Sequence, residues 1–261
     1  MTTKNKPPLV PDAVQTSRAT PPATASAKAP AVRASNDTEV TDFVAQMKAL
    51  TQCKGQGRGR LVFAMDATMS RQPTWDMALA LQAEMFTVVK DVGGLDVQLV
   101  YFRGADECRA SKWVSNPDAL ARLMSGVECH GGYTQIRKVL THTVKEAGTR
   151  KVNALVLVGD AMEENIDDLC GRAGELALIG CPVFLFQEGN DATVSRTFKE
   201  IARLTKGAHC RFDAGSAAQL KALLTAVAVY AAGGQKALLA LSQSSNGAGA
   251  RLLLSQIKPG G

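Results

Sequence analysis

Residues 61–70 read LVFAMDATMS, an apolar run that ends in an acid and is followed by two hydroxyl side chains at alternate positions. An apolar run of this length predicts a short buried strand. Asp66, Thr68 and Ser70 then stand where the strand stops. Three oxygen donors within five residues suit a small hard cation such as Mg²⁺. The stretch therefore predicts both a central strand and a candidate metal site at its end.

The rest of the chain alternates between short apolar runs and longer segments with helical spacing. This alternation indicates a mostly parallel sheet that is covered by helices on both faces. We therefore expect an α/β protein: a Rossmann-like three-layer αβα domain with a mostly parallel central sheet and one antiparallel edge strand. Strands are expected at 61–65, 96–102, 107–114 (the antiparallel one), 151–158, 182–187 and 208–212, and helices at 74–91, 117–125, 134–147, 165–179, 192–205 and 216–230.

Two further oxygen donors follow the same logic. Asp160 closes a second apolar run, 155–158, and Thr134 follows a pair of glycines just before an expected helix. In open α/β sheets, ligands bind beyond the carboxyl ends of the strands, at the point where the strand order reverses. If the strand order is 3-2-1-4-5-6, that point lies between the strands that end in Asp66 and Asp160. We therefore expect these side chains to meet at one edge of the sheet.

This set of residues resembles the metal-ion-dependent adhesion site (MIDAS) of von Willebrand factor A (VWA) domains. The family motif is Asp-x-Ser-x-Ser, followed by a distant Thr and a distant Asp. The resemblance covers about residues 58–230, with Thr68 in place of the first Ser. The matching residues are Asp66, Thr68, Ser70, Thr134 and Asp160.

The resemblance implies one divalent cation, Mg²⁺ or Mn²⁺, at this site. Thr68 and Ser70 would bind the ion directly, whereas Asp66 and Asp160 would hold it mainly through water. Thr134 would bind directly in the ligand-competent state. Because few formal charges touch the ion, it stays electrophilic, and an Asp or Glu of a partner can complete its coordination shell.

The function that the resemblance implies is a metal-dependent protein-interaction module rather than an enzyme. It resembles the bacterial intracellular type, in which VWA proteins often work beside ATPases or in stress-response complexes. We accordingly expect a protein partner that presents an Asp or Glu, within a cytoplasmic complex.

Three alternatives stay open. A Mg²⁺-dependent hydrolase, either a phosphatase or a nuclease, would need a nucleophile or a base beside the metal, and the motifs contain no His. A structural VWA domain with an inactive site is the second, since Met69 and Ala161 stand where many relatives have Gly. In the third, Asp66 and Ser70 merely cap the helix that follows them.

Glu163 and Glu164 come just after Asp160. They are either solvated loop charges or, for one of them, an internal ligand that fills the open metal position and blocks the site.

The ends of the chain differ from its middle. Residues 1–35 are rich in Pro and Ala, which predicts a disordered tail. Residues 36–57 are expected to form a helix and a loop, with Asn36 as the N-cap. Residues 58–232 would form the VWA-like domain, and 233–261 a C-terminal extension that covers it as either a hairpin or two short helices.

Charge and composition limit the classes of partner and the cellular location that we expect. The formal net charge of +6 comes from the two ends, so the middle of the chain is close to neutral and we expect no nucleic-acid partner. The six cysteines include no C-x-x-C pair, which disfavours a zinc ribbon. The sequence shows no signal peptide, and no run reaches the 18 apolar residues of a spanning helix. Free thiols and these absences favour the cytoplasm.

Overall fold

The computed structural model describes residues 57–257. The expected tail, 1–35, the helix expected after Asn36 and the last four residues lie outside the described part of the chain.

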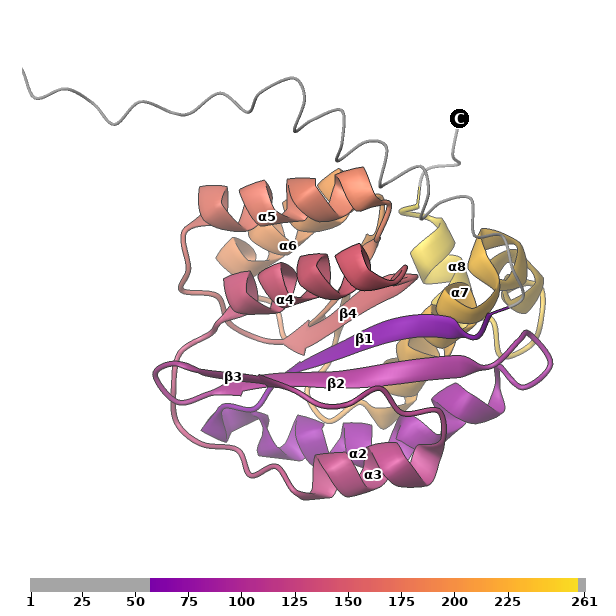
Figure 1. Ribbon diagram of the computed structural model, residues 1–261, viewed down its shortest axis with the longest axis horizontal. Coiled ribbons are helices and arrows are strands. Elements are labelled where there is room, and N and C mark those ends of the chain that lie inside the picture. Colours follow the sequence, from indigo (N-terminus) through magenta and orange to yellow (C-terminus); the bar gives the residue numbers. More distant parts are fainter. Residues whose placement is uncertain (1–56, 258–261) are drawn as a thin grey trace, which may run out of the picture. The chain divides into compact units, whose positions relative to one another are not determined.

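A six-stranded sheet forms the centre of the domain, in the order β3-β2-β1-β4-β5-β6 (Figure 1). All neighbouring strands pair in parallel except β3, which pairs antiparallel with β2 at one edge. The structure therefore confirms the expected fold class, and its strand order is the one on which the expected meeting of Asp66 and Asp160 depended. The strands are β1 (Gly59–Asp66), β2 (Leu95–Arg103), β3 (Glu107–Ala110), β4 (Ala154–Gly159), β5 (Val183–Glu188) and β6 (Ala208–Phe212).

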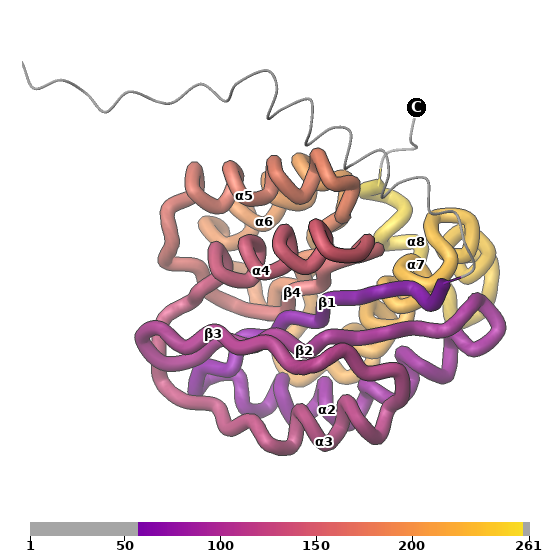
Figure 2. The backbone as a smooth tube through the Cα atoms, viewed as in Figure 1, coloured from indigo at the N-terminus to yellow at the C-terminus, as the bar shows by residue number. Residues whose placement is uncertain are grey.

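Helices cover both faces of the sheet because the inner strands are apolar on both sides. Alternate residues of β1 illustrate this: Phe63 packs into one core and Val62 into the other. Figure 2 shows β1 running between β2 and β4, with helices on either side. One face carries α2 (Gln72–Thr87), α3 (Pro117–Ser125), α7 (Ala217–Ser242) and α8 (Ala248–Leu254), and the other α4 (Ile136–Thr149), α5 (Ile166–Ile179) and α6 (Ala192–Thr205).

The C-terminal segment is helical, so the hairpin alternative is wrong. Helix α7 continues past its expected end at residue 230 and kinks at Gly234, whose φ of 67° is readily adopted only by glycine. Helix α8 follows, and Leu238, Leu253 and Ile257 are buried in the same core as β1. A second, smaller difference is that α2 covers 72–87 rather than 74–91.

Within the described residues, α7 is long and apolar enough to cross a membrane by length and composition alone, with a mean hydropathy of 1.3. This segment was not identified from the sequence, because it contains no uninterrupted run of 18 apolar residues. Nearly half of the apolar window, 44%, is buried inside the domain, as in a helix that packs on a sheet.

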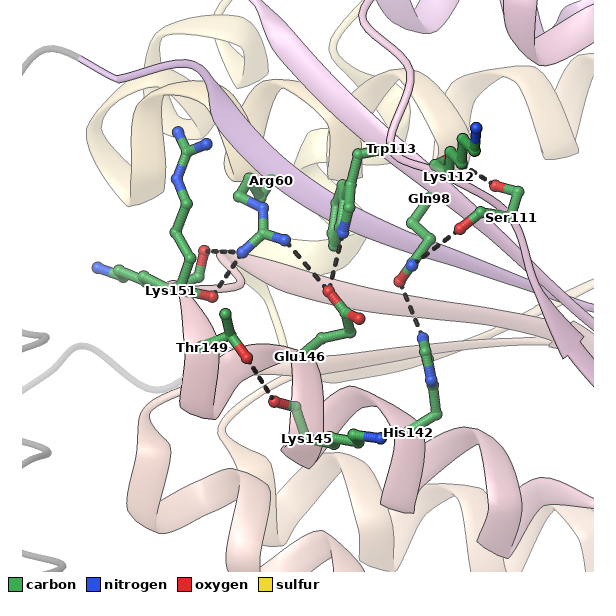
Figure 3. Close-up of polar contacts among 11 residues, drawn as sticks. Arg60, Gln98, Ser111, Lys112, Trp113, His142, Lys145, Glu146, Thr149 and Lys151 are labelled. Atoms are coloured by element: carbon green, nitrogen blue, oxygen red, sulfur yellow. Dashed lines mark hydrogen bonds and ion pairs between the residues drawn. The ribbon is translucent and has the colours of Figure 1, made fainter.

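A polar network ties the segment after β3 to helix α4 (Figure 3). The buried Arg60 guanidinium stacks 3.8 Å from the centre of the Trp113 ring and pairs with Glu146 at 3.3 Å. The Trp113 indole donates to the same Glu146 oxygen at 2.8 Å. Beside them, His142 contacts Gln98, which donates to the Ser111 carbonyl. One carboxylate therefore satisfies a buried cation and an indole from two different elements.

We expect Glu146→Ala to lower the free energy of unfolding by about 2 kcal/mol, because it leaves the Arg60 charge without its carboxylate. The exposed Lys145, one residue earlier on the same helix, gives the matched control Lys145→Ala. Urea unfolding followed by circular dichroism measures both. Equal stabilities for the two variants would contradict this role.

His209 on β6 is a buried ionisable group. Its Nε2 lies 2.9 Å from Gln187 Oε1, and its ring packs edge-on against Phe198. Burial, with the charges of Lys199 and Arg211, lowers the pKa of His209 to about 4. The unfolded chain therefore takes up this proton at a higher pH than the folded domain does.

This difference predicts that the domain loses stability as the pH falls from about 6.5 towards 4, and that the contribution is fully present above 6.5. By pH 5 the loss from His209 is about 2 kcal/mol. Other groups titrate in the same range, so the measurement is the difference between wild type and His209→Gln in urea unfolding at pH 7.5 and 5. The gap between them should narrow at pH 5, while the exposed His130→Gln variant follows the wild type. The same difference in unfolding free energy between wild type and His209→Gln at both pH values would contradict the role of His209.

Candidate metal centre

Asp66 is the last residue of β1 and is almost fully buried. Its Oδ1 accepts a hydrogen bond of 2.7 Å from the Thr68 amide, which turns the chain sharply out of the strand. Neither the short 3-10 helix at Met69–Arg71 nor α2 has a side-chain N-cap. The alternative that Asp66 and Ser70 serve as helix caps is therefore wrong.

Parallel pairing brings Asp160 to the same place. Met65 of β1 lies opposite Val158 of β4, so the two strands end side by side. A Cβ on Gly159 would lie only 3.7 Å from the Asp66 Cβ. Asp160 follows immediately, and this adjacency is the one that the strand order predicted.

The loop before α4 delivers Thr134. The His130 amide donates to the Ala67 carbonyl just beyond β1, and the Tyr133 amide donates to the Gly104 carbonyl at the β2–β3 turn, each at 3.0 Å. Gly132 lies flat against that turn, because a Cβ there would sit 2.2 Å from the Gly104 oxygen. Backbone hydrogen bonds therefore fix the loop at His130 and at Tyr133, just before Thr134.

All five residues that the motif selects line one pocket of about 300 Å³. Within the described residues, two buried carboxylate oxygens of this pocket, Asp66 Oδ2 and Asp160 Oδ1, have no hydrogen-bond partner. An unpaired buried carboxylate oxygen is costly unless a cation or water satisfies it. The donor set of two carboxylates and three hydroxyls fits a hard divalent cation.

The charges of the pocket also favour a cation. The pKa of Asp66 is raised to about 6, mainly by burial. The hydrogen bonds from Thr68 and the charge of Arg71 oppose this rise, and the charge of Asp160 adds to it. Burial likewise raises the pKa of Asp160, which Arg71 lowers. Two carboxylates whose ionised forms are both disfavoured would be stabilised by a positive ion between them.

Arg71 is a buried cation beside the site. Its role could not be recognised from the sequence. Its Nη2 lies 3.2 Å from Asp160 Oδ2, and its Nη1 pairs with the buried Glu188, to which Thr74 also donates. Glu188 could have been noticed, because it ends the apolar strand β5 as Asp66 ends β1. The distant partner of Arg71, in contrast, leaves no local signal.

The two acids after Asp160 have different surroundings. Glu164 accepts hydrogen bonds from the Ile136 and Arg137 amides, so it caps the start of α4 and lies outside the pocket lining. Glu163 lines the pocket and accepts from both the hydroxyl and the amide of Thr134, at 2.6 and 2.9 Å. Of the two, only Glu163 is placed to reach a bound ion.

No group of three or more His, Cys, Asp or Glu side chains within residues 57–257 has an arrangement suited to a metal. The candidate site owes its donors instead to a mixture of carboxylates and hydroxyls.

We expect Gly132→Ala to weaken divalent-ion binding about tenfold or more without touching a proposed ligand, since its methyl group would displace the Thr134 loop from the Gly104 backbone. Gly131→Ala is the matched control, because a Cβ there meets nothing within 4 Å. Mn²⁺ titration calorimetry compares the two. Equal affinities would show that the position of this loop does not matter for the ion.

Comparisons with known proteins show the fold. No protein-family model matches the sequence, and no curated protein sequence matches it significantly. Among solved structures, proximal thread matrix protein 1 from the mussel byssus matches with a TM-score of 0.54 and 17% identity, over 67% of this chain and 48% of its own. The SpRpn10 VWA domain matches with a TM-score of 0.52 and 9% identity, over 65% of this chain and 95% of its own.

The pilus adhesin SpaC from Lactobacillus rhamnosus GG matches with a TM-score of 0.52 and 11% identity, over 66% of this chain and 30% of its own. The chain thus spans less than half of two of these proteins and nearly all of the isolated VWA domain. The described residues have the fold of a von Willebrand factor A domain.

Proposed function

We propose that this domain is a protein-interaction module that binds a carboxylate of its partner through Mg²⁺ or Mn²⁺. The observation that carries the proposal is the convergence of Asp66, Thr68, Ser70, Thr134 and Asp160 on one pocket, where two carboxylate oxygens are buried without a partner. These residues come from three separate segments of the chain, so their meeting is not a product of sequence proximity.

The roles follow from the chemistry of each group. The hydroxyls of Thr68, Ser70 and Thr134 would hold the ion directly, while Asp66 and Asp160 would balance its charge. When bound, the ion supplies a positive centre that can accept an oxygen of an incoming acid. Without it, the negative lining of the pocket would repel that acid.

Exposed side chains beside the proposed ligands support an interaction role. Met69 and Tyr133, each 65% exposed, flank the proposed ligands in the sequence. Methionine and tyrosine are enriched at protein interfaces, where they supply contact area around a polar centre. A partner acid with apolar neighbours would suit these two side chains.

The similar structures add support at the level of the fold. SpaC is, by its name, a pilus adhesin, and an isolated VWA domain matches over nearly its full length. We further propose that the module works in a cytoplasmic complex of a bacterial intracellular type, beside an ATPase or in a stress-response assembly. Its proposed role is binding and not catalysis; a Mg²⁺-dependent hydrolase and a structural domain with an inactive site are the competing proposals.

The first test is metal binding by calorimetry. Wild-type protein should bind one Mg²⁺ or Mn²⁺ and melt at a higher temperature when loaded, because the ion binds only the folded state. Ser70→Ala should weaken binding by roughly tenfold, and Asp66→Asn by more. Ser125→Ala removes a hydroxyl of α3 that does not line the pocket and serves as control. Wild-type affinity in both site variants would rule out this ligand set.

The second test is the dependence of a partner complex on the ion. Once a partner is identified, its complex should dissociate with excess chelator and weaken with Ser70→Ala, whose side chain is exposed and whose loss should leave the fold intact. The melting temperature of the metal-free variant checks the fold. A complex that persists under both treatments would place the interaction elsewhere on the protein.

A further inference from the structure

Glu163 is a third carboxylate in the candidate metal centre that the motif does not include. It lies in the loop between β4 and α5, lines the pocket together with Asp66 and Asp160, and is exposed to solvent. An exposed glutamate ordinarily faces water. Here its Oε2 instead contacts a proposed metal ligand, Thr134.

Three hydrogen bonds hold Glu163 and Thr134 together. The carboxylate accepts from the Thr134 hydroxyl at 2.6 Å and from its amide at 2.9 Å, and the Glu163 amide donates back to the same hydroxyl at 3.2 Å. The neighbouring Glu164 anchors the loop by capping α4. The loop is thereby tied to the start of α4 at two points, so the Glu163 carboxylate is presented to the pocket.

The distance between the two oxygens is compatible with a shared ion. Two oxygens bound at adjacent positions of an octahedral Mg²⁺, each about 2.1 Å from it, lie about 2.9 Å apart. Oε2 of Glu163 is already 2.6 Å from Oγ1 of Thr134. An ion held by Thr134 would therefore have the Glu163 carboxylate within reach, with only a small adjustment of a flexible side chain.

The charges point the same way. Three carboxylates line the pocket. Arg71 contacts Asp160 among them, and its other nitrogen is engaged by Glu188. Two of the three pocket carboxylates, Asp66 and Glu163, therefore have no ion-pair partner among residues 57–257. A divalent cation would balance that charge.

We propose that Glu163 is a ligand of the bound ion and occupies the coordination position that a partner acid would otherwise take. This inference rests on the proposed metal site. Partner binding is then an exchange of one carboxylate for another, in which Glu163 leaves the ion and the incoming acid replaces it. The exchange lowers the affinity for any single free carboxylate and favours partners that also contact the surface around the pocket.

The test uses full-length protein loaded with Mn²⁺, and acetate as the probe of the carboxylate position. Water-proton relaxation counts the waters on the ion, and acetate titration reports how readily a carboxylate enters its shell. The variants are Glu163→Gln, which keeps the size and the acceptor, and Glu163→Ala, which removes both. Asp167→Asn is the matched control, because it removes an exposed charge at the start of α5 that does not line the pocket.

Glu163→Ala should bind Mn²⁺ several-fold more weakly than wild type, carry about one more water on the ion and bind acetate several-fold more tightly. Glu163→Gln should change in the same directions by less, because its amide oxygen is a weaker ligand, and Asp167→Asn should match the wild type. Wild-type hydration and acetate affinity in both Glu163 variants would overturn the inference while leaving the metal site in place. A wild-type protein that binds no Mn²⁺ at all would overturn the metal site as well, so the two failures can be told apart.

Discussion

The parallel pairing of β1 with β4 is the constraint on which the rest of the structure depends. Because the two strands run in the same direction and end in register, the acids that terminate them lie side by side. Burial makes this juxtaposition unfavourable for the ionised forms, as the raised pKa values of Asp66 and Asp160 show. A fold that keeps two such groups together needs positive charge nearby, from its own side chains or from an ion.

The chain supplies part of that charge itself. Arg71 contacts Asp160 on one side and pairs on the other with Glu188, which also accepts a hydrogen bond from Thr74. The result is an asymmetric pair: one carboxylate is supported by a buried guanidinium, and the other is supported mainly by the Thr68 amide. Oδ2 of Asp66 and Oδ1 of Asp160 remain without hydrogen-bond partners, and one cation could satisfy both.

Most of the fold could be predicted from the sequence because its elements are marked by strong local patterns. The central strands β1, β4 and β5 contain apolar runs, and α5 begins within one residue of its expected start, after the Asn165 cap, and ends at Gly180 in a left-handed conformation. The order of the strands could not be derived from the sequence. One possible order would bring the acids at the ends of β1 and β4 together, and the structure has that order. The limits of α2 and the long extent of α7 were missed, because tertiary packing rather than local propensity determines them.

The site divides in the same way. The five motif residues could be selected from the sequence, since each stands at a strand end or a helix start, and the structure brings them to one pocket; whether they bind an ion is still a prediction. Neither the pairing of Arg71 with Glu188, 117 residues away, nor the contact between Glu163 and Thr134 could be derived from local spacing. Such contacts depend on the relative positions of loops, which only the folded chain defines.

The flat contact between Gly132 and Gly104 bears on how this protein can change over evolutionary time. Turns at the edge of a sheet are usually where chains accept insertions, because little depends on their length. Here the turn between β2 and β3 supports the loop that carries Thr134, through the hydrogen bond from Tyr133 and through a backbone contact that leaves no room for a side chain. The length of this surface turn is therefore tied to the pocket, and a side chain at position 132 would be selected against even though Gly132 holds no ligand.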